Sequence, residues 1–162
     1  MLNRPLDKTD LRILAELQKN SKLTNIELAE RVALSPSPCL RRLKQLEDSG
    51  IIRRYVALLE PTKIKLGLQA FIRIMLEKPG NTHRQGFISA VQQWPEVISC
   101  YAMTGEIDYV LQTYFEDMEH FSRFIINELL PHPGIEDVKS GIVLKELKHT
   151  TALPINHLSY FI

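Results

Sequence analysis

The chain has 162 residues, of which 44% are hydrophobic and 24% are charged, and its formal net charge is +1. This composition is typical of a globular protein and excludes a disordered, collagen-like or disulfide-rich chain. Residues 1–7 lack the apolar core of a signal peptide, and no apolar run approaches the roughly 20 residues that cross a bilayer. We therefore expect a cytoplasmic protein with no membrane partner.

The small net charge hides an uneven distribution along the chain. Residues 1–66 contain 13 Lys and Arg against 8 Asp and Glu, a net charge of +5, whereas residues 67–162 contain 7 against 11, a net charge of −4. The first part suits a polyanion such as nucleic acid, and the second part repels one. Two small domains would each bury a modest fraction of their surface, so we also expect association with other subunits.

Three helices are expected in the first part. Leucines at helical spacing predict a helix over 6–20, with Asp7 as its N-cap. The capping box Thr24-Asn25-Ile26-Glu27 opens a short second helix. After a tight turn, Ser35 can cap a third helix whose first turn contains two prolines, where the missing amide costs no helical hydrogen bond. This helix is expected to end near Ser49.

The third helix has two different faces. The residues expected to pack inward are Cys39, Leu40, Leu43 and Leu46. The residues expected on the outward face are Ser37, Arg41 and Lys44, at positions i, i+4 and i+7, with Arg42 and Gln45 beside them.

The first part has the layout of a winged-type helix-turn-helix. It contains two short helices, a tight turn, a basic third helix and a β-rich segment at 51–58. The third helix would enter the major groove, while Arg53 and Arg54, on a wing-like strand, would contact phosphates. The alternative is a solvated basic helix face, but the capping box, the turn and the charge bias together favour double-stranded DNA. The predicted DNA-binding residues are Ser35, Ser37, Arg41, Arg42, Lys44, Gln45, Arg53 and Arg54.

The second part alternates between strand and helix patterns. Strands are expected at 68–77, 97–103, 107–115 and 135–147, and helices from 81 to Pro95 and from Asp117 to Leu130. The order βαββαβ is that of a ferredoxin-like sandwich, with two helices on one face of the sheet. The expected fold class is therefore α+β, with a helix-turn-helix domain at 1–60, a linker at 61–67, and the sandwich with a C-terminal tail at 68–162.

The other face of this sheet would be apolar if it were left bare. The strand residues available to it are Phe71, Met75, Val110, Tyr114 and Val143. A large exposed apolar patch is uncommon on a monomer, so this face, or an edge of the sheet, is expected to meet another subunit.

Several segments resemble one bacterial family. Five segments of the first part resemble the N-terminal signature of the Lrp/AsnC (leucine-responsive, feast/famine) transcription regulators. They are Leu6-Asp7-Lys8-Thr9-Asp10, Glu27-Leu28-Ala29, Leu34-Ser35-Pro36-Ser37-Pro38-Cys39-Leu40-Arg41-Arg42, Leu46-Glu47 and Gly50-Ile51-Ile52. Residues 99–109 look like the effector-sensing region of that family. The resemblance spans about 6–147.

The resemblance implies homodimers formed through the sheets, assembly of dimers into rings, often octamers, and an amino-acid effector bound between dimers. The matching positions are Met103, Thr104, Gly105 and Asp108, with Glu128 and Ile142 as further pocket candidates. Gly105 would let backbone approach a ligand, and the Asp108 carboxylate could pair with its ammonium group. Ile107 stands where relatives often carry an aromatic residue. The expected effector is leucine or another apolar amino acid.

Other functions have less support. The five histidines are scattered without i, i+4 pairs, and no catalytic or phosphate-binding motif occurs, so no metal, no cofactor and no enzyme activity are expected. Tyr109 and Tyr114 could stack on RNA bases, but their acidic surroundings favour packing instead. The leading hypothesis is an effector-responding transcription regulator. Its rivals are an effector-independent architectural DNA-compacting protein and, last, an enzyme with a DNA-binding appendage.

Overall fold

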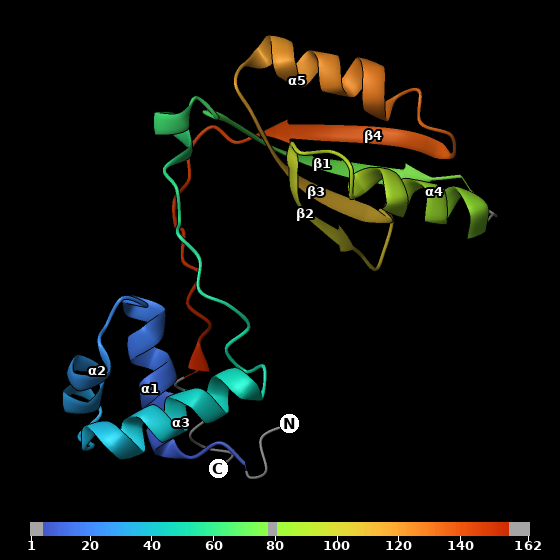
Figure 1. Cartoon of the computed structure of the whole chain (residues 1–162). Coiled ribbons are helices and arrows are strands. Elements are labelled where there is room, and N and C mark those ends of the chain that lie inside the picture. The colour runs from blue at the N-terminus through green and yellow to red at the C-terminus, as the bar shows by residue number, and fades with distance from the viewer. Residues whose placement is uncertain (1–4, 78–80, 156–162) are drawn as a thin grey trace. The chain divides into compact units, whose positions relative to one another are not determined.

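A computed structural model describes residues 5–77 and 81–155, which form two compact units (Figure 1). One unit contains residues 5–57 together with 148–155, and the other contains residues 58–147. The sequence placed the tail in the second domain, whereas the structure groups 148–155 with the first unit. Gln18 accounts for this grouping, because its side-chain amide donates to the Leu153 carbonyl at 3.2 Å and accepts from the Leu153 amide at 2.6 Å.

The first unit is built on the three expected helices, α1 (Lys8–Lys19), α2 (Asn25–Arg31) and α3 (Pro36–Asp48). Asp7 and Thr24 begin the first two through complete capping boxes, as the sequence predicts. Ser35 occupies the N-cap of α3, but within the described residues its side chain makes no capping hydrogen bond. The buried core of the unit consists of Ile13, Leu28, Ala29, Val32, Cys39 and Leu46.

The turn between α2 and α3 depends on one residue with left-handed backbone geometry. Ala33 has a φ of 56°, and the amides of Ala33 and Leu34 donate to the carbonyls of Glu30 and Ala29 at 3.2 and 2.9 Å. This pair of bonds is the Schellman arrangement that ends a helix, with alanine at the position where glycine is favoured.

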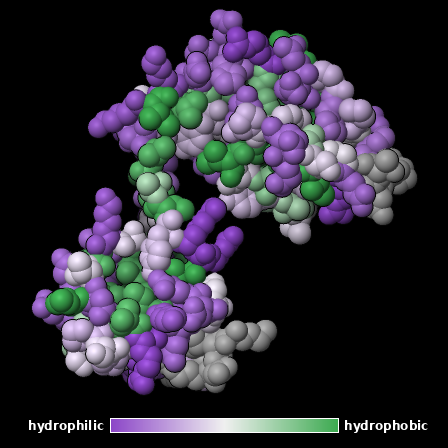
Figure 2. All heavy atoms as spheres, in the orientation of Figure 1, coloured by the Kyte–Doolittle hydropathy of each residue, from purple (hydrophilic) through white to green (hydrophobic). Residues whose placement is uncertain are grey.

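Two expectations for the first unit are wrong. Leu40 is 54% exposed, because it lies at the edge of the packed stripe of α3 and not within it. Residues 51–58 form no strand, since a strand needs a hydrogen-bonded neighbour and none of the described residues supplies one. Val56, Leu58 and Leu59 are consequently 58 to 67% exposed, and Figure 2 shows hydrophobic residues at the surface of the segment that joins the units.

The second unit confirms the βαββαβ order. Its elements are β1 (Leu68–Leu76), α4 (Asn81–Val91), β2 (Val97–Ala102), β3 (Tyr109–Phe115), α5 (Met118–Phe124) and β4 (Ile135–Ile142), with a 3₁₀ turn at Pro61–Ile64 and a π-helical turn at Ile125–Leu129. The strands form one antiparallel sheet in the order β2-β3-β1-β4. As expected, Asp117 caps α5, accepting the amide of His120 at 2.8 Å.

Helices α4 and α5 cover one face of the sheet (Figure 1). Alternation along β3 buries Tyr109, Leu111, Thr113 and Phe115 against them, as its period-two pattern predicts. Phe87 of α4 and Phe124 of α5 complete this core. On the opposite face Phe71 is 40% exposed, and Met75, Val110 and Tyr114 are half-buried, so an apolar outer face is present.

Candidate functional sites

The outward face of α3 presents a group of polar and cationic side chains. Ser37, Arg41, Lys44 and Gln45 are all exposed, and so is Ser35 just before the helix. At about 100° per residue, positions 37, 41 and 44 project from one side of the helix. The structure therefore brings these predicted DNA-binding residues together on one surface.

Arg42 departs from this set. Its Nη1 donates to Asp7 Oδ2 at 2.7 Å and to Asp10 Oδ1 at 2.9 Å, so its charge is paired within the unit. The helix geometry explains why, because Arg42 lies only about 60° around α3 from the buried Cys39. In this structure Arg42 is therefore engaged within the unit, unlike the exposed members of the predicted DNA-binding set, and its helical angle was the signal that could have shown this.

The Arg42 cluster changes the ionisation of its members. Burial opposes ionisation of Asp7, but hydrogen bonds from the Asp10 amide and from Arg42 outweigh it and hold the pKa of Asp7 below its usual value. Hydrogen bonds to Asp7 and Asp10 raise the pKa of Arg42 in turn. The bond from Arg42 to Asp10 joins the middle of α3 to the start of α1, and it is shielded from solvent because Asp10 is 1% exposed.

Two further contacts that sequence reasoning missed position the basic surface. The side-chain amide of Asn25, in α2, donates to the carbonyl of Pro36 at 2.9 Å and ties α2 to the start of α3. The Tyr55 hydroxyl donates to Glu47 at 2.7 Å, and burial together with this hydrogen bond raises the pKa of Tyr55 to about 12. That bond fixes the segment carrying the exposed Arg53 and Arg54 near the end of α3.

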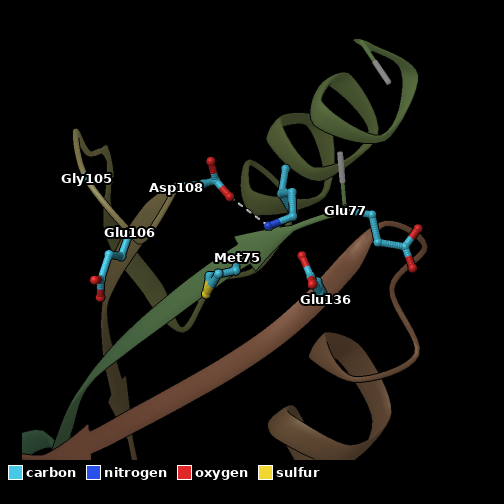
Figure 3. Close-up of a pocket in the computed structure, with 7 residues that line it drawn as sticks. Met75, Glu77, Gly105, Glu106, Asp108 and Glu136 are labelled. Atoms are coloured by element: carbon cyan, nitrogen blue, oxygen red, sulfur yellow. Dashed lines mark hydrogen bonds between the residues drawn. The ribbon is translucent and has the colours of Figure 1, made fainter. Parts of the chain in front are cut away.

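The second unit contains an open cleft of about 600 Å³ at one end of the sheet (Figure 3). Its lining residues are Met75, Leu76, Glu77, Gly105, Glu106, Asp108 and Glu136. They come from the end of β1, the β2–β3 loop and the start of β4. The pairing of Leu76 with Ile135, across a register shift in β1, sets the end of β1 beside the start of β4, and the pairing of Ile74 with Tyr109 sets the β2–β3 loop beside the end of β1.

Asp108 is the most firmly held of these residues. Its Oδ2 accepts the amide of Leu76 at 2.8 Å, the bond drawn dashed in Figure 3, and its own amide donates to the carbonyl of Ile74 at 3.0 Å. The carbonyl of Asp108 accepts the amide of Met103 at 2.8 Å. Asp108 therefore fixes both the base of the loop and the irregular end of β1.

The structure gathers only part of the predicted effector set. Gly105 and Asp108 line the cleft, whereas Met103 and Thr104 are exposed neighbours in the same loop. Ile142 does not line it, because it pairs with Ala70, six residues from Leu76 along β1 and about 20 Å away. Glu128, exposed on the π-helical turn, does not line it either.

Four carboxylates dominate the chemistry of the cleft, and the sequence analysis missed Glu77, Glu106 and Glu136. Carboxylates favour an ammonium group, while Met75 and Leu76 offer apolar surface. Gly105, with a φ of 111°, lets the loop backbone approach a ligand closely. Glu77 and Glu136 could not be grouped with the loop from the sequence, because pairing of β1 with β3 and β4 brings them there, whereas Glu106 lies only two residues from Asp108 in the same loop.

The described residues contain neither a membrane-spanning helix nor a metal-binding cluster. No helix among them is long and apolar enough to span a bilayer. No three His, Cys, Asp or Glu side chains within residues 5–77 and 81–155 are grouped as a metal site would require.

Comparison with known proteins gives the same assignment for both units. Residues 6–53 match the model of a winged helix-turn-helix DNA-binding domain, and residues 69–153 match that of the Lrp/AsnC ligand binding domain. The chain is 38% identical over 152 residues to the leucine-responsive regulatory proteins of Klebsiella pneumoniae and Escherichia coli K12, covering 94% of this chain and 93% of theirs.

Solved structures agree with these matches. A transcriptional regulator from Neisseria meningitidis, solved as an L-Met complex, is 60% identical with a TM-score of 0.92, covering 95% of this chain and 99% of its own. An AsnC family transcriptional regulator from Agrobacterium tumefaciens is 34% identical with a TM-score of 0.89, covering 94% and 99%. The chain therefore belongs to the Lrp/AsnC family of transcription regulators, with an N-terminal winged helix-turn-helix and a C-terminal ligand-binding domain of ferredoxin-like fold.

Proposed function

We propose that this regulator reads double-stranded DNA with the outward face of α3 and senses a free amino acid in the acidic cleft at the β2–β3 loop. The observation that carries the proposal is the separation of two chemically opposite sites. An exposed cationic surface lies in the first unit, and a cleft lined by four carboxylates lies in the second. A bacterial regulator of this kind works in the cytoplasm.

The DNA site consists of Ser35, Ser37, Arg41, Lys44 and Gln45 on α3, with Arg53 and Arg54 beyond it. Ser37 and Arg41 lie in the first two turns of α3, the part of a recognition helix that contacts base edges. Arg53 and Arg54 are exposed, and Tyr55 anchors the segment that carries them. Contacts to bases give specificity, and contacts to phosphates give salt-dependent affinity.

Matched substitutions test this division of roles. Arg41→Ala should lower the preference for a promoter over random DNA, while Arg53→Ala should weaken binding to both and reduce the salt slope by about one. Fluorescence anisotropy across a salt series measures both quantities. Glu30→Ala, an exposed change on α2, is the control. Equal affinity of the wild-type chain for every DNA would contradict specific recognition.

An apolar amino acid fits the cleft best. The carboxylates would hold its ammonium group, loop amides around Gly105 would hold its carboxylate, and Met75 with Leu76 would contact its side chain. The Neisseria neighbour is an L-Met complex, which supports methionine as the effector here, and the leucine-responsive regulatory proteins among the relatives support leucine.

Asp108 supplies a sharp test of the effector site. Asp108→Ala removes both the charge and the acceptor for the Leu76 amide, whereas Asp108→Asn keeps an oxygen acceptor and removes only the charge. A thermal-shift screen of free amino acids should give a rise in Tm that Asp108→Ala abolishes. Glu128→Ala, outside the cleft, should leave it intact. No rise with any amino acid would favour the architectural alternative.

The asparagine variant separates two roles for Asp108. If its charge contacts the ligand ammonium, Asp108→Asn loses the shift as Asp108→Ala does. If it acts by holding the end of β1, Asp108→Asn retains most of the shift. Retention in both variants would move the effector site elsewhere.

Assembly completes the proposal. We propose homodimers that pair two DNA-binding units on a pseudo-palindromic site and associate further, up to an octamer. An effector can change DNA affinity only if it prefers one assembly or conformation. Light scattering with and without effector measures the change, and a stable monomer at micromolar concentration would contradict it.

A further inference from the structure

Leu40 is an apolar side chain of α3 that the core of the first unit does not use. It is 54% exposed, and among the described residues it is neither part of that core nor packed against it. On the same helix, Cys39 and Leu46 are at most 1% exposed. Single exposed leucines are common on protein surfaces, so the place of Leu40 on the helix decides whether this one has a function.

Leu40 lies beside the polar residues of the outward face. Ser37 precedes it by three residues and Lys44 follows it by four, which are the spacings of neighbours on a helix surface. At about 100° per residue, Leu40 is about 60° from Ser37 and about 40° from Lys44 around the axis. It is about 100° from the buried Cys39. Leu40 is therefore closer to the surface that carries the proposed DNA contacts than to the core.

Contacts from both other helices fix α3 in this orientation. The side-chain amide of Asn25, in α2, donates at 2.9 Å to the carbonyl of Pro36, one turn before Leu40. Arg42 donates to two carboxylates at the start of α1, at 2.7 and 2.9 Å. Rotation of α3 that buried Leu40 would strain these bonds, so the exposed position of Leu40 is held by the unit.

The chemistry of leucine limits what Leu40 can recognise on DNA. Its side chain has no hydrogen-bond donor or acceptor, so it cannot read the polar base edges that suit Ser37, Arg41 and Lys44. The major groove also presents one methyl group, on C5 of thymine, and apolar side chains read thymine through it. A leucine among the polar residues of a recognition helix is therefore suited to a thymine.

We propose that Leu40 is a specificity-determining residue that packs against the C5 methyl group of a thymine in the bound DNA. The inference rests on the proposed reading of DNA by the outward face of α3, to which it adds a preference for one base. Because Leu40 is already exposed in the free chain, the contact removes apolar surface from water without disturbing the core. It also gives this exposed leucine a function that the fold of the unit does not explain.

Replacement of thymine by deoxyuridine tests the contact directly. Deoxyuridine lacks only the C5 methyl group and keeps every hydrogen-bonding group of the base. The probe is a DNA duplex that the wild-type chain selects from a random-sequence pool, with each thymine replaced in turn. Fluorescence anisotropy then measures the dissociation constant of each duplex for the wild type and for each variant.

The wild type and Leu40→Ala should differ in their response to the missing methyl group. At one thymine position or more, the wild type should bind the deoxyuridine duplex about fourfold more weakly, the effect expected when one methyl group is no longer removed from water. Leu40→Ala should bind the thymine and deoxyuridine duplexes equally at that position. It should keep the wild-type Tm, since Leu40 lies outside the core.

Two further variants serve as controls. Leu40→Met keeps an apolar side chain of similar volume and should retain the preference for thymine over deoxyuridine. Ile26→Ala removes an apolar side chain that is 61% exposed on α2, in the same unit. It should leave that preference unchanged, because the thymine contact is assigned to α3.

The outcomes separate this inference from the proposed function. If the wild type enriches no sequence from the pool, specific recognition and the role of Leu40 are both wrong. If it enriches a sequence that Arg41→Ala recognises less well, but no deoxyuridine replacement weakens binding, the role of Leu40 alone is wrong. The same conclusion follows if Leu40→Ala remains as sensitive to deoxyuridine as the wild type, whether or not its Tm or its association with other subunits changes.

Discussion

Two adjacent arginines on α3 should respond in opposite ways to substitution. Arg42 donates to Asp7 at 2.7 Å and to Asp10 at 2.9 Å, whereas Arg41 is exposed on the outward face. We expect Arg42→Ala to destabilise the first unit and Arg41→Ala to leave its stability unchanged while reducing DNA specificity.

The structure sets the size of the Arg42 effect. A hydrogen bond between charged groups is worth about 1.5–3 kcal/mol, and an exposed ion pair under about 1 kcal/mol. Asp10 is 1% exposed, so its bond belongs to the first class, while Asp7, 40% exposed, belongs nearer the second. Asp10 still accepts the Asp7 amide at 3.0 Å. The loss should therefore be about 2–3 kcal/mol, which for a unit of this size lowers Tm by roughly 10–20 °C.

Urea unfolding followed by circular dichroism measures the loss, and anisotropy with promoter DNA measures binding in the same samples. Arg42→Lys should recover part of the stability, since an ammonium can reach one carboxylate but not both in the guanidinium geometry. If Arg42→Ala unfolds at the same urea concentration as the wild type but binds all DNA more weakly, Arg42 is a phosphate contact and the structural role assigned to it is wrong.

Three further outcomes are expected. Ala33→Gly should raise stability by about 0.5–1 kcal/mol, since glycine takes the left-handed position without the steric cost that alanine incurs, and equilibrium unfolding measures the change. Because the pKa of Asp7 is lowered, its contribution is complete above about pH 4 and is lost as the pH falls further, so acid unfolding of the helices should be shallower in Arg42→Ala. The Tyr55 phenol should titrate with a pKa of about 12 in an ultraviolet titration, and Glu47→Gln should lower that pKa.

The amino-acid sequence determined the local elements. The capping boxes at Asp7 and Thr24 use hydrogen bonds between residues three apart, so their signals are complete within a short segment. The alternation of residue types along β3 likewise predicts which of its side chains face the core. The family signature added the two functions, and the comparisons confirmed them.

Tertiary structure decided which charged residues serve the fold and which remain available for binding. Arg42 meets Asp10 across 32 residues, and Asp108 meets the Leu76 amide across another 32. Glu136 joins the cleft only because β4 pairs with β1 in one register. Residues 51–58 form no strand because none of the residues that the structure describes pairs with them. Short-range patterns carry no information about such pairings, since each depends on packing between segments that are distant in the chain.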